Sequence, residues 1–370
     1  MAGAGPAAAA AAYLAMVPQG VRAAAARHAE AEVAAWALKL IGPLAIAVLL
    51  VRSGAVEQAW RWGGRRGRPA ASLAVVGLLA AASCIFDALV WWATAGETPG
   101  LGGLCAGLLG RAALFAAAWG LLKAAGPRPR LVLGALAAAA SFALVFGPEA
   151  AGELTGAPRD RAPTEAAGAA RAIARASGVA VSEVVLSASA PAEGDVAGLF
   201  RPARILLTPE AAGAPLAEVR AGVGHVLGHY RARDGLGWAL LLAALGAGGA
   251  AGVIGLYGPV ATAVWGPSPS RGRIAVSDPR ALPLLWALAA AWIGLAQPVA
   301  FAWDRAVNLR ADRFSLEHAR EPDGLAVSLV RQNGLQPVDP PLIERLIVCS
   351  HPPLKDRLDQ AMRWKAAQAR

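Results

Sequence analysis

The chain has 370 residues, of which 56% are hydrophobic and only 16% are charged, and its formal net charge is +10. Globular domains carry about 25% charged residues, so the composition excludes a single soluble domain, and it excludes intrinsic disorder because disordered chains are poor in apolar residues. Three cysteines, Cys84, Cys105 and Cys349, are too few and odd in number for a disulfide scaffold. The composition therefore predicts an integral membrane protein.

Six stretches have the length and apolar character of membrane-spanning helices, which need about 20 mostly apolar residues. The last two are the strongest, because no charged residue occurs between Asp234 and Arg271 or between Arg280 and Asp304. Tryptophans lie near most of the predicted ends, as they do at membrane interfaces. The predicted spans are residues 34–51, 70–93, 99–122, 131–147, 236–265 and 281–303.

The basic charge concentrates in three loops between these spans. Residues 52–69, 123–130 and 266–280 contain eleven Arg and Lys residues but only two acidic residues, Glu57 and Asp278. With six spans these loops share one face of the membrane, which the positive-inside rule assigns to the cytoplasm. The net charge is thus explained as a topology signal, and we expect no nucleic-acid binding.

Two charged residues, Asp87 and Arg111, fall inside the second and third spans. A charge in hydrocarbon is costly unless it is paired or hydrated. The two residues therefore predict either an ion pair between neighbouring helices or the lining of a polar chamber.

The polar segment between spans four and five has the pattern of a small α/β unit. A helix is predicted over 164–177, strands over 181–188 and 203–208, and a second helix over 215–233. His225 and His229 are four residues apart on this second helix and therefore share one face. Two imidazoles at this spacing can bind one metal ion.

Three ordered motifs then resemble one family. "AEVRAGVGHVLGHYRARD" (217–234) is similar to the active-site helix of the membrane zinc metallopeptidases of family M48, the gluzincins that include the CAAX prenyl proteases and HtpX-type proteases. "NLRADRF" (308–314) resembles the family's E-x-x-A-D segment, and "CSHPPLKDRL" (349–358) resembles its S-H-P-P-x-x-x-R-L segment. "AGLFRPARILLTPE" (197–210) resembles the strand before the active-site helix, with Val196–Ala197 nearest to the family's edge-strand Asn-Ala.

The resemblance implies a zinc site with two substitutions. In H-E-x-x-H the histidines bind zinc and the Glu is the general base, and Val226 stands at the Glu position. Asn308 stands at the position of the third ligand, also a Glu in the family. His225 and His229 are retained, so one zinc ion is possible, and Asp304, Asp312 or His318 could substitute as a ligand only after a shift of several Å.

The family also implies roles for three further residues. Asp312 would be a carboxylate that orients a metal-binding histidine, or alternatively would form a salt bridge with a nearby Arg. His351 and Arg357 would lie near the scissile carbonyl of a substrate as catalytic residues. Alternatively, their segment serves only to begin the last helix, with Pro352 and Pro353 setting its N-terminus.

The predicted fold is a mainly α integral membrane protein with about six transmembrane helices and a small α/β zincin-like domain. Its predicted parts are an N-terminal segment (1–33), four spans (34–147), the metallopeptidase-like unit with the motif helix (148–234), two spans (235–303) and a C-terminal helical part (304–370). We expect a multi-pass protein of a bacterial inner membrane. The charge count places the motif helix outside the cytoplasm, whereas the resemblance places it inside.

The substitutions favour a pseudoprotease that keeps a scaffold for a peptide or membrane-protein partner. The alternative is an active, divergent metalloendopeptidase that cleaves membrane or lipidated proteins. A transporter, which Asp87 and Arg111 would suit, leaves the three motifs unexplained.

Overall fold

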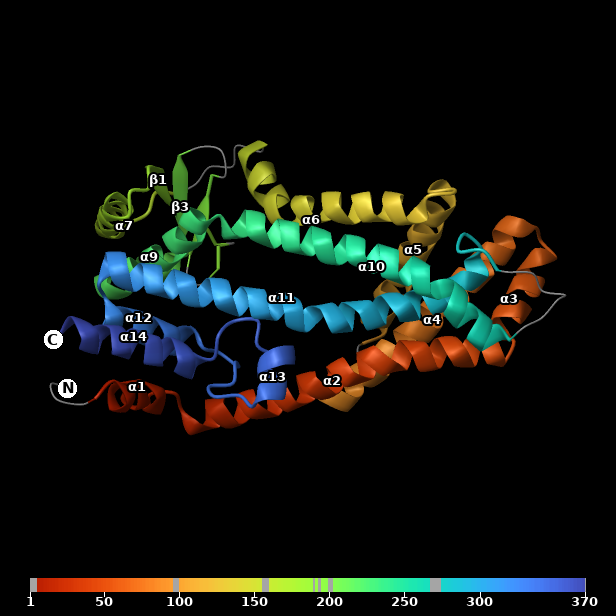
Figure 1. The fold of residues 1–370 in the computed structure, drawn as a ribbon, viewed down its shortest axis with the longest axis horizontal. Helices are drawn as coiled ribbons and strands as arrows, with labels where there is room; N and C mark the ends of the chain where they lie inside the picture. The colour runs from red at the N-terminus through yellow and green to blue at the C-terminus, as the bar shows by residue number, and fades with distance from the viewer. Residues whose placement is uncertain are drawn as a thin grey trace. The chain divides into compact units, whose positions relative to one another are not determined.

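A computed structural model gives the architecture of the chain (Figure 1), and it describes residues 5–95, 100–154, 160–188, 190–191, 194–198, 202–266 and 274–369. Pro99, Arg271, Arg273 and residues 199–201, which entered the sequence predictions, lie outside the described residues. The chain divides into two compact units, one of residues 1–30, 142–239 and 299–370 and the other of residues 31–141 and 240–298.

Within the described ranges, six helices are long and apolar enough to cross a membrane, which confirms the predicted number. They are α2 (Gln19–Arg52), α4 (Arg68–Ala95), α5 (Leu101–Ala124), α6 (Pro129–Leu154), α10 (Asp234–Trp265) and α11 (Leu282–Ala319). Several of these helices extend beyond the apolar stretches that the sequence predicted as spans. α11 has 38 residues, about 57 Å at 1.5 Å per residue, so the polar segment 308–314 continues the same helix as the last span.

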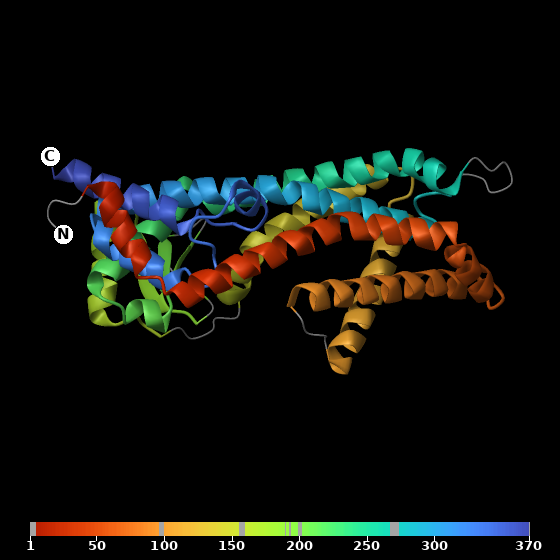
Figure 2. The ribbon, with the colours of Figure 1, turned by 90° about the horizontal axis from the view of Figure 1, so that it is seen from below.

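The unit of residues 31–141 and 240–298 contains α3 (Ala55–Gly64), α4, α5 and the short 3₁₀ helix η1 (Pro279–Ala281). α3 packs closely on α4 because Gly63 has no side chain: a Cβ there would lie 2.5 Å from the carbonyl oxygen of Ala70. α4 and α5 cross each other within this unit (Figure 2). Asp87 of α4 and Arg111 of α5 form an ion pair between them. The predicted helix-to-helix pair is therefore present.

The other unit holds the α/β part. Strand β1 (Val181–Leu186) is parallel to β3 (Ala203–Leu207), and β2 (Asp195–Ala197) is antiparallel to β3, so β3 is central. Alternate side chains of β3 are buried, as a strand covered by helices requires. The sequence predicted β1 and β3; β2 adds an edge strand at the Val196–Ala197 position.

Helices surround this sheet and complete the unit. α7 (Thr164–Ala176) and α9 (Leu216–Ala232) share a core with the sheet. α1 (Pro6–Ala15) packs with α12 (Pro322–Gln332) and α14 (Leu354–Gln368), where the Tyr13 hydroxyl donates to Asp323 at 2.7 Å. The remaining short helices are α8 (Pro209–Ala212) and α13 (Leu342–Ile347).

α9 approaches α11 closely through two glycines. A Cβ at Gly224 would lie 2.7 Å from Ser315 Oγ and 2.9 Å from Ser315 Cα, and a Cβ at Gly228 would lie 3.0 Å from Ala311 Cα. Since Gly224 meets Ser315 and Gly228 meets Ala311, the two helices run antiparallel at this contact. The hydroxyl of Ser315 donates to the Ala221 carbonyl across it at 2.7 Å.

We expect Gly224→Ala to lower the free energy of unfolding by about 1–3 kcal/mol, because overpacking forces backbone to move. Thermal unfolding of the detergent-solubilised protein measures this. Gly168→Ala in α7 is the matched control: nothing lies within 4 Å of its Cβ, so replacing a helical Gly there should stabilise the protein. Equal stability of the two variants would contradict the close approach.

Candidate metal centre

α9 brings His225 and His229 together, as their spacing predicted. Their ring centroids lie 4.7 Å apart with an interplanar angle of 82°, and the two Nε2 atoms are separated by 3.1 Å. His225 is buried, whereas 28% of the His229 side chain is exposed. The pair is therefore reachable from one side.

Each histidine is oriented by a carboxylate on another helix. The Nδ1 of His225 donates to Asp312 Oδ1 of α11 at 2.8 Å, and the Nδ1 of His229 donates to Asp234 Oδ2 of α10 at 2.8 Å. An ionised carboxylate only accepts, so Nδ1 carries the proton, and each imidazole in its neutral form has its lone pair on Nε2. The lone pairs of the two Nε2 atoms then point toward the same place, where one metal ion could bind both.

This arrangement suits a zinc ion. Zinc binds imidazole nitrogen at about 2.0–2.1 Å in tetrahedral sites, which places two such nitrogens about 3.3 Å apart. The observed 3.1 Å between the Nε2 atoms is close to this spacing. A carboxylate on the far ring nitrogen is also the usual support of metal-binding histidines.

Two arginines neutralise the carboxylates. Arg357 of α14 donates from Nε and from a terminal nitrogen to Asp312 at 2.6 and 2.7 Å, and Asp312 is fully buried. Arg310 pairs with Asp234. Asp312 therefore contacts both His225 and an arginine; its role beside a metal-binding histidine stays a prediction.

Asn308 lies on the same face of α11 as Asp312, one turn earlier. Its Nδ2 donates to the Asp304 carbonyl at 2.9 Å, and its buried Oδ1 has no hydrogen-bond partner among the described residues. Because α9 and α11 are antiparallel, the step from His225 to His229 matches the step from Asp312 to Asn308. Asn308 is thus level with His229 along the helix pair.

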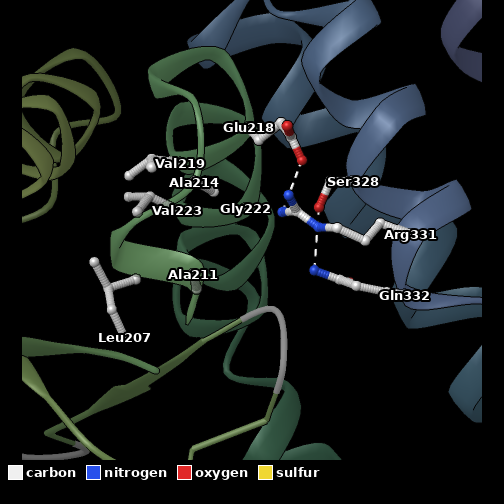
Figure 3. Close-up of a pocket in the computed structure, with 10 residues that line it drawn as sticks. All are labelled: Leu207, Ala211, Ala214, Glu218, Val219, Gly222, Val223, Ser328, Arg331 and Gln332. Carbon is white, nitrogen blue, oxygen red and sulfur yellow. Dashed lines mark hydrogen bonds and ion pairs between the residues drawn. The ribbon is translucent and has the colours of Figure 1, made fainter. Parts of the chain in front are cut away.

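Carboxylates are missing where the family would use them. Val226 is a buried apolar residue, and no group of three or more His, Cys, Asp or Glu that could hold a metal is found within the described ranges. Glu218 of α9 does not compensate: it pairs at 2.7 Å with Arg331 of α12 beside a cavity of about 20 Å³, with room for a single water (Figure 3). His318 contacts its own helix, at Phe314.

The contacts of the 349–358 motif are mainly structural, because they join the segment to α11 and begin α14. Arg305 donates to the carbonyls of Arg345 and Cys349 at 2.7 and 2.6 Å, which fixes the start of the motif to α11. Burial raises the pKa of the Cys349 thiol. His351 contacts Ser350 at 3.2 Å, and Pro353 precedes α14 as its N-cap. A catalytic role for His351 and Arg357 stays a prediction.

The partner of His229 was missed from the sequence. Arg233 ends α9 in the left-handed conformation, with φ of 55°, and this turn lets Asp234 reach back to His229. The spacing His-x-x-x-x-Asp across a helix end was the available signal. On the other side of α9, the Tyr230 hydroxyl donates at 3.1 Å to the Gly198 carbonyl, next to β2.

We expect Asp312→Asn to lower the free energy of unfolding by about 3–5 kcal/mol, because Arg357 would keep a buried charge without its partner. The double variant Asp312→Asn/Arg357→Met should lose less than the two single variants together. Chemical denaturation of all three measures the coupling. Additive losses would show that the pair does not act as one unit, and Lys355→Met, at an exposed ion pair with Asp339, serves as the control.

Comparisons with known proteins found a matching family model and a similar solved fold. Residues 196–365 match the model of peptidase family M48, a range that contains all three motifs. The crystal structure of S. mikatae Ste24p is similar to this structure, with a TM-score of 0.54, 15% sequence identity, and coverage of 86% of this chain and 83% of that chain. No curated protein matched the sequence. The comparisons thus show that residues 196–365 are similar to peptidase family M48, and that the chain shares its overall fold with a membrane protein of known structure.

Proposed function

We propose that this chain is a multi-pass membrane pseudoprotease that holds one zinc ion on His225 and His229 without the family's general base. The observation that carries the proposal is the convergence of the two Nε2 atoms at 3.1 Å, next to a buried Val226. The retained scaffold would serve to bind a peptide or a membrane-protein partner. We also propose the bacterial inner membrane as its location.

Both histidines have the carboxylate hydrogen-bond partners that metal-binding histidines usually have. Asp312 and Asp234 fix both imidazoles in the tautomer that exposes Nε2, and the orphaned amide oxygen of Asn308 is available as a third, weaker donor. Removing such supporting partners typically weakens metal binding by about 10–100-fold. Their retention here favours a site that still binds metal.

The hydrolytic half lacks a proton acceptor. Bound zinc makes water acidic enough to act as a nucleophile near neutral pH, but a positioned base contributes a further factor of about 10²–10⁴. Val226 cannot accept a proton. Glu218 is paired with Arg331, and Asp234 with His229 and Arg310, so neither neighbouring carboxylate is available to replace it.

The alternative is an active, divergent metalloendopeptidase. Its support is the preserved geometry of the histidines and their carboxylates, which is more than partner binding alone requires. It would need a base from the substrate or from a rearrangement of Asp234, and that rearrangement would release His229. We therefore favour the inactive protein.

Purified protein should contain about one zinc ion per chain, as measured by elemental analysis. His229→Ala should lose the metal, because one of two converging donors is removed. His318→Ala, a histidine that contacts its own helix at Phe314, should retain it. Equal zinc content in the wild type and in His229→Ala would contradict a metal centre at this pair.

Restoring the two family carboxylates should restore hydrolysis. We expect Val226→Glu/Asn308→Glu to cleave an unfolded protein such as casein in a chelator-sensitive manner, while the wild type does not. The same double variant with His229→Ala added is the inactive control. Chelator-sensitive cleavage by the wild type would support the active alternative, and no cleavage by a zinc-loaded double variant would contradict the assignment of the lost chemistry to these positions.

A further inference from the structure

The side chain of Asn308 is oriented by its own helix. A backbone carbonyl only accepts hydrogen bonds, so the 2.9 Å contact with the Asp304 carbonyl identifies the nearer atom of the amide as Nδ2. Oδ1 therefore occupies the opposite branch of the amide. It is buried without a hydrogen-bond partner in the described part of the chain, and leaving an acceptor in this state is unfavourable.

The donors around the histidines carry no net charge. Two imidazoles and one amide are neutral, and Val226 adds no charge. Asp312 and Asp234 are negative, but each is paired with an arginine, Arg357 and Arg310 respectively. The two imidazoles, the amide and the two Asp–Arg pairs therefore sum to zero, whereas the family's two Glu residues would bring two negative charges to the same place. The nearby carboxylate of Asp304 lies beside the other branch of the amide, with Oδ1 at 3.5 Å from Asn308 Nδ2.

A divalent cation held by these residues would keep its full charge in a largely buried site. Burying an uncompensated charge is strongly unfavourable, so an anion from outside the chain would stabilise the loaded site. Zinc accepts carboxylate oxygen readily. The exposed side of His229, with 28% of its side chain accessible, is the approach that such a ligand would use.

We propose that Asn308 gives the centre a neutral His–His–Asn donor set, and that the metal-loaded site consequently binds a ligand bearing a free carboxylate. This inference rests on the proposed metal binding by His225 and His229. With this donor set the site would bind an anionic group instead of polarising a peptide bond. Asn308 would thus make the site selective for a carboxylate ligand, in addition to being a weaker metal ligand than Glu.

Cobalt(II) binding tests the inference, because its visible absorption reports changes in the ligands without any activity assay. The detergent-solubilised full chain is loaded with cobalt(II) and titrated with sodium acetate at constant ionic strength. Acetate should change the spectrum of the wild type in a saturable manner, and chloride should have a much weaker effect. An equal response to chloride would overturn the carboxylate specificity.

Asn308→Glu should weaken acetate binding by at least about tenfold, because the new carboxylate would repel a second anion at short range. The same variant should bind cobalt(II) more tightly than the wild type, which also verifies that it is folded. Gln336→Glu, the same charge change at an exposed position, should leave both affinities unchanged.

The two proposals fail differently. If the wild type binds cobalt(II) but acetate has no effect, or Asn308→Glu binds acetate equally well, the present inference is wrong and the metal centre stands. If the wild type does not bind cobalt(II) and His229→Ala behaves identically, the proposed metal centre itself is wrong.

Discussion

The close approach of α9 to α11 is the contact on which the candidate site depends. Gly224 and Gly228 leave no space for a Cβ against Ser315 and Ala311, and this separation lets Asp312 reach the ring of His225 at 2.8 Å. A wider spacing would leave Asp312 as a buried carboxylate with one partner fewer. The helix pair thus fixes the tautomer of a histidine through backbone packing, before any ligand is considered.

The paired carboxylates hold both histidines of the candidate site. Asp312 and Asp234 each satisfy the Nδ1 of one histidine and one arginine, so the protein itself holds both imidazoles in place, while their two Nε2 atoms face each other at 3.1 Å. Val226 is an apolar residue in a buried position. Asn308 has a buried amide oxygen without a hydrogen-bond partner in the described part of the chain, at the position that the sequence resemblance gives to the third ligand.

Much of the architecture could be predicted because it follows from composition and periodicity. Six apolar stretches gave six long helices, and Asp87 and Arg111 paired because charges in apolar helices need partners. The four-residue step from His225 to His229 was enough to place both rings on one face. The extension of α11 through residue 319 was less evident, since the charge at Asp304 marks the end of the apolar stretch but does not show whether the helix continues.

The sequence by itself determined the class of the protein, the positions of the two histidines and the absence of a carboxylate at Val226 and Asn308, because these depend on residue identity and local spacing. Only the tertiary structure decided which groups meet. Arg357 is 45 residues from Asp312, and His225 is 87 residues from it, so no local pattern could pair them. The hydrogen bond between His229 and Asp234 depends on the left-handed turn at Arg233. That Oδ1 of Asn308 has no hydrogen-bond partner could be found only from the positions of the neighbouring donors.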